Sequence, residues 1–298
     1  SSAASDVYKR QMLAVTNPGD KVIIFSPFYE NYGADTILAG AEPIYVALKP
    51  PSFSFHVGEL EQAFRQGAKA LILCNPSNPC GKVFSYGELR IIADLAVKYD
   101  AYVITDEVYE HIVYEPCKHT YLSSLPGMSE RTIICSSLSK TYSITGWRLG
   151  YVIAAPHIAG RIKKVHDFLT VGAAAPLMEA AVVGLAFPDE YYYELRRHYT
   201  HMKDLFIGGL KDLGLTFTEP QGAYYVLVDV SEFGVRDDVR FCEWMAEKVG
   251  VGAVPGSSFF REEVHHLIRL HFAKRDDTLY EALNRLEGLK KKAESYRD

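Results

Sequence analysis

The chain has 298 residues, 48% of them hydrophobic, and a formal net charge of -5 at pH 7. This size and apolar fraction predict a globular protein with one large domain and one smaller domain. The mild acidity argues against a nucleic-acid partner, and no run of about 18 apolar residues predicts a membrane span, which leaves small molecules as the expected partners.

The chain starts with "SSAASDVYKRQ", which has neither the charged start nor the apolar core of a signal peptide. Its end, Asp6 to Gln11, matches the translated end of a common sequencing adapter, so we expect residues 1–11 to be a non-native leader. The chain continues abruptly as "MLAVTNPGDKVIIFSP", which is typical of a helix end, a turn and a buried strand. We therefore expect the natural protein to begin upstream.

Short apolar runs, each bounded by turn residues, recur through the first half of the chain. They are residues 21–26, 42–47, 70–74, 102–106, 132–136 and 150–155. The runs are continuous rather than alternating and rich in β-branched residues, which is typical of a sheet covered on both faces. A helix whose start carries a capping box of Ser85 and Glu88 precedes the fourth run. The pattern predicts an α/β large domain over residues 12–190.

The second half of the chain has more helical patterns and fewer strand patterns than the first. Residues 176–187 and 189–214 have helical patterns, and the second of these is long enough to connect two domains. Strand patterns at 223–230 and 267–273 flank a helical pattern at 236–250, and the chain closes with one predicted helix over 276–295. These elements predict a smaller α+β domain over residues 191–298.

The cysteines and histidines are interpreted as structural residues. The five cysteines, at positions 74, 80, 117, 135 and 242, are odd in number and form no C-x-x-C pair. Such usage favours a reducing compartment, so we expect a cytoplasmic protein, with Cys74 and Cys135 as small core residues. Histidines lie close together at 198–201 and 265–271, but without a cysteine or carboxylate cluster we expect no metal site.

Polar or aromatic residues follow several of the predicted strands. Tyr29 follows the first run, the turn "NPSNPCG" with Asn78 follows the third, and Asp106 and Tyr109 follow the fourth. Lys140 follows the fifth. In open α/β sheets ligands bind beyond the carboxyl ends of the strands, so we expect these side chains to line one crevice.

The surroundings of Lys140 indicate chemistry on its amine. An amine that forms a Schiff base needs a lowered pKa, which nearby positive charge and partial burial provide, and Arg148 would supply part of that charge. The hydroxyls of Ser137 and Ser139 together with the Arg148 guanidinium offer the hydrogen bonds of a phosphate site. The stretch therefore predicts a phosphorylated aldehyde as ligand.

Four separated motifs carry a family resemblance. The segments "SLSKTYSITGWRLGY", "NPSNPCG", "TDEVYE" and "LIRLHFA" resemble the corresponding motifs of class I aminotransferases of the aspartate aminotransferase kind, which are fold type I enzymes that use pyridoxal 5'-phosphate (PLP). The resemblance covers nearly everything after residue 12, in the same order. It implies a mostly parallel sheet between helices, a smaller C-terminal domain, and amino-group transfer between an L-amino acid and a 2-oxo acid.

The resemblance also implies roles for residues that would contact PLP. Lys140 would form the Schiff base and then move the proton between the substrate Cα and the cofactor. Asp106 would pair with the ring nitrogen and keep it protonated. Tyr109 and Asn78 would bond the phenolic oxygen, and Tyr29 would stack on the ring.

Further roles concern the phosphate and the substrate. Ser137 and Arg148 would hold the phosphate, and Arg269 would bind the substrate α-carboxylate as a two-pronged clamp, with Asn78 beside it. Cys80 stands where the family usually has threonine. Relatives also have an N-terminal segment that supplies a phosphate-binding loop, a tyrosine for the other subunit and specificity residues, so the resemblance implies a homodimer for the full-length protein.

Other readings of the same residues remain open at this point. Asp106 and Ser137 are also suited to capping a helix or turn, Asn78 to a turn, Arg269 to a strand, and Tyr29 to packing. The segment 221–226 is interpreted as a packing strand near the domain interface rather than a site. A PLP-dependent C–S β-lyase or decarboxylase of the same fold, or a PLP-sensing regulatory domain, are the alternative functions.

Overall fold

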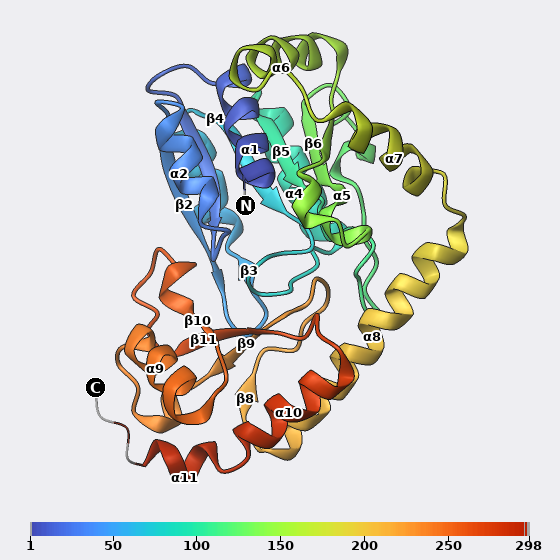
Figure 1. Ribbon diagram of the computed structural model, residues 1–298. Coiled ribbons are helices and arrows are strands. Elements are labelled where there is room, and N and C mark those ends of the chain that lie inside the picture. Colours follow the sequence, from blue (N-terminus) through green and yellow to red (C-terminus); the bar gives the residue numbers. More distant parts are fainter. Residues whose placement is uncertain (1, 295, 297–298) are drawn as a thin grey trace.

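The computed structural model describes residues 2–294 and Tyr296, with side chains from Lys9 onward. The chain forms a seven-stranded sheet and a four-stranded sheet. Helix α8 (Asp189–Asp212) runs along one side of the molecule and connects the two parts (Figure 1). This helix is the element that the sequence predicted as the connection between the domains.

The large sheet has the strand order β3-β2-β1-β4-β5-β6-β7. Its strands are β1 (Lys21–Ser26), β2 (Glu42–Lys49), β3 (Ser54–Phe55), β4 (Ala68–Cys74), β5 (Tyr102–Asp106), β6 (Thr132–Ser137) and β7 (Gly150–Ile153). Strands β2, β1, β4, β5 and β6 pair in parallel, whereas β3 and β7 pair antiparallel to their neighbours. The predicted α/β class with a mostly parallel sheet is therefore confirmed.

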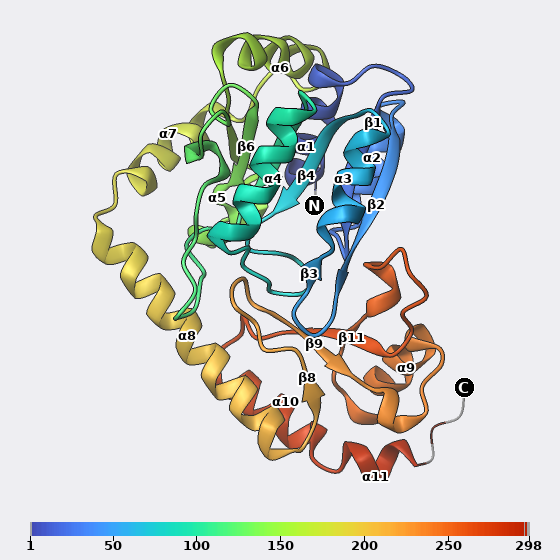
Figure 2. The same cartoon turned by 180° about the vertical axis from the view of Figure 1, so that it is seen from behind.

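Helices cover both faces of this sheet (Figures 1 and 2). They are α1 (Ser2–Val15), α2 (Asn31–Leu38), α3 (Val57–Arg65), α4 (Tyr86–Lys98) and α6 (Pro156–Leu169). Helix α7 (Ala175–Leu185) has no buried residue and leads on to α8 (Figure 1). The adjacent residues Ile23 and Ile24 of β1 point into different core clusters, one with α3 and α4 and the other with α1, α2 and α6. This is why the strand has no polar alternation.

Helix α1 includes most of the segment that the sequence predicts to be a leader. Gln11 and Met12 of this helix are buried, and α1 contacts α2, α6, β6 and β7. The first residue lies outside the described part, and the origin of residues 1–11 stays a prediction.

The smaller sheet is antiparallel, with the order β10-β11-β9-β8. Its strands are β8 (Thr216–Phe217), β9 (Tyr225–Asp229), β10 (Val254–Pro255) and β11 (Leu267–His271), and its helices are α9 (Asp238–Trp244), α10 (Asp276–Leu286) and α11 (Leu289–Ala293). The single closing helix predicted over 276–295 is wrong. Gly288 has a φ of 73° and ends the helical path there, because this left-handed conformation interrupts a right-handed helix.

The sequence predicted no membrane span. Within residues 2–294, no helix is long and apolar enough to cross a membrane.

The predicted capping box at the start of α4 is confirmed, and it has an additional partner. The Ser85 side chain accepts from the Glu88 N–H, and the Glu88 carboxylate accepts from the Ser85 N–H at 2.9 Å. Lys82 Nζ lies 2.8 Å from the same carboxylate, and the Lys82 side chain is only 6% exposed. This pair fixes the turn of residues 75–82 on the N-terminus of α4.

We predict that Glu88→Gln destabilises the fold in a pH-dependent way. Burial raises the pKa of Glu88, but the Lys82 and Ser85 hydrogen bonds outweigh this and leave the pKa below 4.5. The ionised pair therefore stabilises the fold above pH 4.5, and this stabilisation is lost as the pH falls through the folded-state pKa. Urea unfolding at pH 7 should show a loss of about 3 kcal/mol, because Lys82 keeps a buried charge without its partner.

The control for this prediction is Glu130→Gln, which changes an exposed glutamate in the same domain. The difference in unfolding free energy between the wild type and Glu88→Gln should shrink on acidification. Equal stability of the two proteins at pH 7 would contradict the role given to the pair.

Candidate active site

The candidate site lies at the carboxyl edge of the large sheet, where β5 and β6 end side by side. Asp106 is the last residue of β5 and pairs in parallel register with Cys135 on β6. Strand β6 ends at Ser137 and leads directly into the short helix α5 (Leu138–Thr141), which carries Lys140. The predicted acid and the predicted amine therefore come from adjacent strand ends, with Asp106 buried and Lys140 half-buried.

Asp106 is held by two donors in this site. The Tyr32 hydroxyl, from α2, donates to Oδ2, and the Val108 N–H donates to Oδ1 at 3.1 Å. A turn rather than a helix follows Asp106, so the alternative role of a helix cap does not apply. Burial raises the pKa of the neighbouring Cys74 thiol, and the Asp106 charge raises it further. Cys74 is partly buried next to Asp106, whereas Cys135 is fully buried, as the sequence predicted.

Two tyrosines of α8 form hydrogen bonds with the end of α5, the short helix that carries Lys140. The Tyr191 hydroxyl donates to the Thr141 carbonyl at 2.7 Å, and the hydroxyls of Tyr142 and Tyr192 lie 2.8 Å apart. The Lys140 Nζ lies 5.8 Å from the centre of the Tyr224 ring. The amine is thus placed against an aromatic face of the smaller domain.

Ser137 is the last residue of β6, and Arg148 lies in the segment that leads into β7. Ser137 Oγ accepts from the Ser139 N–H at 3.1 Å and lies 2.7 Å from the Ser139 hydroxyl, so Ser137 caps α5 as the structural alternative expected. Arg148 donates from Nη1 to the Thr145 carbonyl at 2.7 Å. Its Nε atom is buried and has no hydrogen-bond partner. A buried donor of this kind favours an external acceptor.

Asn78 and Arg269 are brought together from the two sheets. Arg269 on β11 donates from Nη1 to Asn78 Oδ1 at 2.6 Å. The Arg269 guanidinium carbon lies 4.4 Å from the centre of the Tyr225 ring and 4.3 Å from that of Phe259. These two cation–π contacts restrict the orientation of the guanidinium.

Tyr109 joins these groups to the smaller domain. It is buried, and its hydroxyl lies 2.8 Å from the Tyr225 hydroxyl. Its ring meets the Tyr224 ring edge-on at 5.2 Å. Burial raises the pKa of Tyr109 well above its ordinary value, with the neighbouring tyrosines adding to the effect, so the phenol stays protonated.

Residues 221–226 lie against the large domain, near the domain interface as predicted, and two of them contact predicted site residues. Tyr224 lies over the Lys140 amine, and Tyr225 contacts both Tyr109 and Arg269. The sequence placed the segment near the interface, but the contacts of Tyr224 and Tyr225 with Lys140, Tyr109 and Arg269 are made through space and have no local sign in the sequence.

The same segment docks on the turn that carries Asn78. The N–H groups of Gln221 and Gly222 both donate to the Gly81 carbonyl, at 2.9 and 2.8 Å. Gly81 has a φ of 67°, and a Cβ atom there would lie 3.0 Å from the Gly222 carbonyl oxygen, so glycine is required. Cys80, which departs from the family pattern, is buried in this turn, with its Sγ 3.3 Å from Ser77 Oγ.

Tyr29 lies next to the tyrosine that bonds the acid. Its ring meets the Tyr32 ring edge-on at 5.7 Å, and Tyr32 in turn bonds Asp106. Tyr32 was missed by sequence reasoning. Its position three residues after Tyr29 in a helix carries no local sign of a contact with β5.

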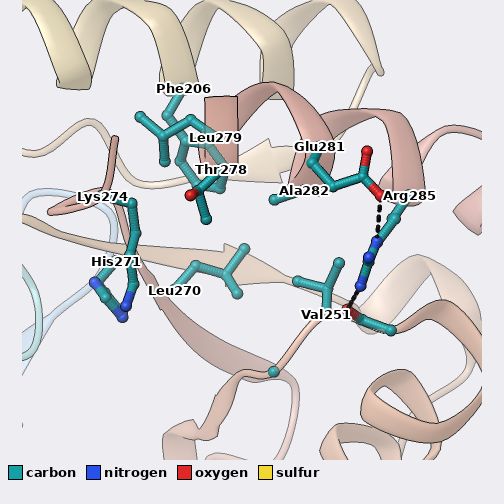
Figure 3. A pocket seen from close by; sticks show the side chains of 12 residues that line it. Phe206, Val251, Leu270, His271, Lys274, Thr278, Leu279, Glu281, Ala282 and Arg285 are labelled. Atoms are coloured by element: carbon teal, nitrogen blue, oxygen red, sulfur yellow. Dashed lines mark hydrogen bonds and ion pairs between the residues drawn. The ribbon is translucent and has the colours of Figure 1, made fainter. Parts of the chain in front are cut away.

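A separate cavity of about 280 Å³ lies in the smaller domain, between α8, α10 and β11 (Figure 3). Phe206, Leu270 and Leu279 form its apolar wall, and Lys274 and Arg285 lie at its rim. None of the predicted cofactor or substrate residues lines it. The cavity is therefore distinct from the sheet edge that carries Asp106 and Lys140.

Comparison with known proteins agrees with the arrangement of these motifs. The family described as aminotransferase class I and II matches residues 4–286. The chain belongs to this family. It therefore transfers an amino group between an amino acid and a 2-oxo acid, as the four motifs predicted.

Two curated relatives illustrate the match. The chain is 34% identical to the probable N-succinyldiaminopimelate aminotransferase of Mycobacterium tuberculosis, over 96% of this chain and 75% of that protein. It is also 34% identical to the methionine aminotransferase of Escherichia coli, over 97% of this chain and 75% of that protein. The chain thus spans about three quarters of the length of these aminotransferases.

Solved structures of aminotransferases have the same fold. The N-succinyldiaminopimelate aminotransferase of Mycobacterium tuberculosis superposes with a TM-score of 0.91 at 35% identity, over 96% of this chain and 76% of that chain. The aromatic aminotransferase of Pyrococcus horikoshii gives a TM-score of 0.91 at 32% identity, over 97% of this chain and 78% of that chain. These matches confirm the predicted fold type I architecture.

Proposed function

We propose that this aminotransferase binds PLP at the sheet edge between Asp106 and Lys140 and carries out the transfer there. The observation that carries the proposal is the buried Arg148 Nε, which has no hydrogen-bond partner, while the carbonyl of the next residue, Leu149, accepts from the Ser137 hydroxyl at 3.1 Å. A phosphate would satisfy this nitrogen and complete a charge-assisted site. The donor set therefore fits the phosphorylated cofactor of the family.

The phosphate group would be held by residues at the start of α5 and before β7. Ser137 and Ser139 lie with their hydroxyls 2.7 Å apart, so both can turn toward one acceptor. Arg148 adds a permanent positive charge from the neighbouring turn. The N–H groups of α5 are not needed for this assignment, because the hydroxyls and the guanidinium already offer several donors.

The ring would lie between the acid of β5 and the residues of the smaller domain. Asp106 would meet the ring nitrogen, and its buried carboxylate is already oriented by Tyr32 and the Val108 N–H. Tyr109 and Asn78 would donate to the phenolic oxygen, and the protonated state of Tyr109 suits that role. Tyr29 would cover one face of the ring.

Lys140 would link covalently to the cofactor aldehyde and afterwards act as general base and acid. When bound, PLP supplies an acceptor for the electron pair that remains when the Cα proton of the amino acid leaves. The Lys140 amine would take this proton and return it at the neighbouring carbon. Tyr224 would restrict the amine to that side, because its ring lies against Nζ.

Arg269 would bind the α-carboxylate of the amino acid. Its guanidinium is held by the hydrogen bond to Asn78 and by the rings of Tyr225 and Phe259, so it presents a fixed edge to a carboxylate. A fixed guanidinium binds a carboxylate through two parallel hydrogen bonds. Because Asn78 would also donate to the phenolic oxygen, it would connect the substrate and cofactor positions.

We also propose that the aminotransferase works as a homodimer in a reducing, cytoplasmic setting. Helix α7 has no buried residue, although it is strongly apolar. Val182 and Val183 on α7 are 60% and 63% exposed, and Phe168 at the end of α6 is 93% exposed. An exposed apolar surface of this kind favours a self-complementary contact with a second copy. The five free thiols are consistent with a reducing compartment.

Replacement of the lysine tests the cofactor site. After incubation with PLP and reduction with borohydride, we expect the intact mass of the wild type to increase by one cofactor, and that of Lys140→Ala to stay unchanged. Lys118→Ala, which removes an exposed lysine, is the control and should behave as the wild type. A full adduct on Lys140→Ala would place the covalent link at another amine.

Removal of one ring beside the guanidinium tests the substrate site. Phe259→Leu should raise the KM for the amino acid between about twofold and thirtyfold, the range expected for one cation–π contact, with little change in kcat. The neighbouring buried ring offers the matched control, Phe260→Leu. If the two variants have the same KM, Phe259 does not orient Arg269 for the carboxylate.

The proposed dimer contact is tested by charge insertion. Light scattering should report a dimer for the wild type and a monomer for the double variant Phe168→Glu, Val182→Glu, because two carboxylates would be buried without partners in the contact. Val239→Glu changes another exposed valine and should remain dimeric. A wild-type protein that stays monomeric at high concentration would overturn this part of the proposal.

A further inference from the structure

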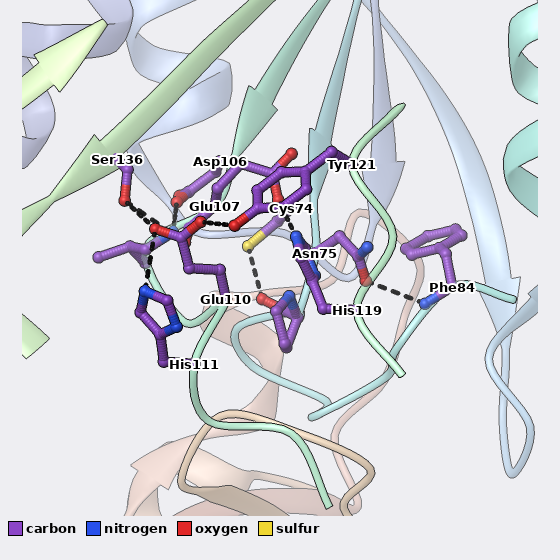
Figure 4. A network of polar contacts seen from close by, with 12 residues as sticks. Cys74, Asn75, Phe84, Asp106, Glu107, Glu110, His111, His119, Tyr121 and Ser136 are labelled. Carbon is purple, nitrogen blue, oxygen red and sulfur yellow. Dashed lines mark hydrogen bonds and ion pairs between the residues drawn. The ribbon is translucent and has the colours of Figure 1, made fainter. Parts of the chain in front are cut away.

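The carboxylate of Glu110 is the centre of a buried network behind the site (Figure 4). Its side chain is only 7% exposed. Oε1 accepts from the Ser136 hydroxyl at 3.2 Å and from the Tyr151 hydroxyl at 3.1 Å, and Oε2 accepts from the Tyr121 hydroxyl at 2.5 Å. Three hydroxyl groups therefore converge on one buried acid, which none of the roles given above involves.

Two of these donors lie next to site residues on different strands. Ser136 directly precedes Ser137 on β6, the strand that leads to Lys140. Tyr151 lies on β7, shortly after Arg148. Glu110 itself directly follows Tyr109 in the turn that begins at Asp106. The Glu110 carboxylate thus connects three segments of the site. They are the segment of Asp106 and Tyr109, the segment of Ser137 and Lys140, and the segment of Arg148.

We propose that Glu110 is a positioning residue that sets the spacing between the Asp106–Tyr109 turn, the end of β6 and the start of β7. This inference rests on the proposed PLP site, because that spacing matters only if one ligand spans the three segments. Glu110 touches none of the groups assigned to the cofactor or the substrate. Its effect on them passes through Ser136 and Tyr151.

A carboxylate is suited to this role in a way that an amide is not. Hydroxyl donors that bond an ionised acceptor form shorter and stronger hydrogen bonds than neutral pairs do. Burial raises the pKa of Tyr151 to about 12, with the Glu110 charge contributing, so its hydroxyl remains a donor. A glutamine at this position would replace one of the two acceptor oxygens by an NH₂ group. Because an NH₂ group is a donor, at least one of the three hydroxyls could no longer donate to the side chain.

The backbone at this edge has support that does not depend on Glu110. The Glu107 N–H donates to the Cys135 carbonyl at 2.8 Å, which continues the β5–β6 pairing. Glu107 is buried and lies 2.7 Å from His119 Nε2. We therefore expect Glu110 variants to fold and to differ in the precision of the site rather than in architecture.

The donors offer a matched set of variants. Ser136→Ala and Tyr151→Phe each remove a hydroxyl from a strand that carries site residues. Tyr121→Phe removes a hydroxyl that donates to the same carboxylate. Tyr121 lies in the loop after residue 115, however, and this loop carries no site residue. Glu110→Gln removes the acceptor charge itself. If Glu110 positions these strands, Ser136→Ala and Tyr151→Phe should change PLP binding and amide exchange as Glu110→Gln does, and Tyr121→Phe should behave as the wild type.

Two measurements are made on each variant. Absorbance titration gives the dissociation constant of PLP, which should rise about tenfold for Glu110→Gln, the loss expected for one hydrogen bond to a charged group. Amide hydrogen exchange of the protein without PLP should be faster at residues 106–110 and 136–140 in Glu110→Gln, Ser136→Ala and Tyr151→Phe. A residue that only stabilises the fold would instead change exchange throughout the large domain.

The outcomes separate this inference from the proposed function. If the wild type itself does not bind PLP, the proposed cofactor site is wrong. If the wild type binds PLP and Glu110→Gln binds it equally well with unchanged exchange, the positioning role is overturned. Equal losses in Tyr121→Phe and Ser136→Ala would overturn it as well. Should Glu110→Gln fail to fold, Ser136→Ala and Tyr151→Phe still decide the question by the same two measurements.

Discussion

The parallel pairing of β5 with β6 is the constraint on which the rest of the site depends. Asp106 opposite Cys135 fixes where each strand ends, and the chain then turns away in both segments. Because parallel strands end at one edge, the buried acid and the lysine-bearing helix α5 emerge as neighbours. Asp106 lies on the face of α2, where Tyr32 bonds it, and a shift of one residue in this register would turn it to the other face, where α3 and α4 pack.

The smaller domain completes the site through its backbone as much as through its side chains. The two hydrogen bonds from residues 221 and 222 to Gly81 fix β9 against the turn of Asn78. From this anchor, Tyr224 and Tyr225 reach Lys140, Tyr109 and Arg269 within a few residues. The contact between domains therefore also determines the geometry of the amine and of the guanidinium.

The sequence was informative where local signals and structure coincide. Residues 21–26 and 102–106 were predicted with the bounds of β1 and β5, because continuous β-branched runs end at polar residues there. Helix α4 was predicted from its capping box, whereas α2, α3 and α6 start at residues without a side-chain cap hydrogen bond and were missed. Likewise, the motifs pointed to Lys140 and Asp106, but contacts made through space, such as Tyr32 with Asp106, have no local signature.

Phenols donate to two of the acids of this region, Asp106 and Glu110, whereas histidines lie beside Glu107 and Glu110. Tyr32 donates to Asp106, and Tyr121 and Tyr151 donate to Glu110. Within residues 2–294, none of the three basic groups of the site, Lys140, Arg148 and Arg269, forms an ion pair with a carboxylate. A carboxylate partner would neutralise these cations and compete with an anionic ligand. Hydrogen bonds from tyrosine satisfy the acids without that competition, so the positive charge remains available for a phosphate and a substrate carboxylate.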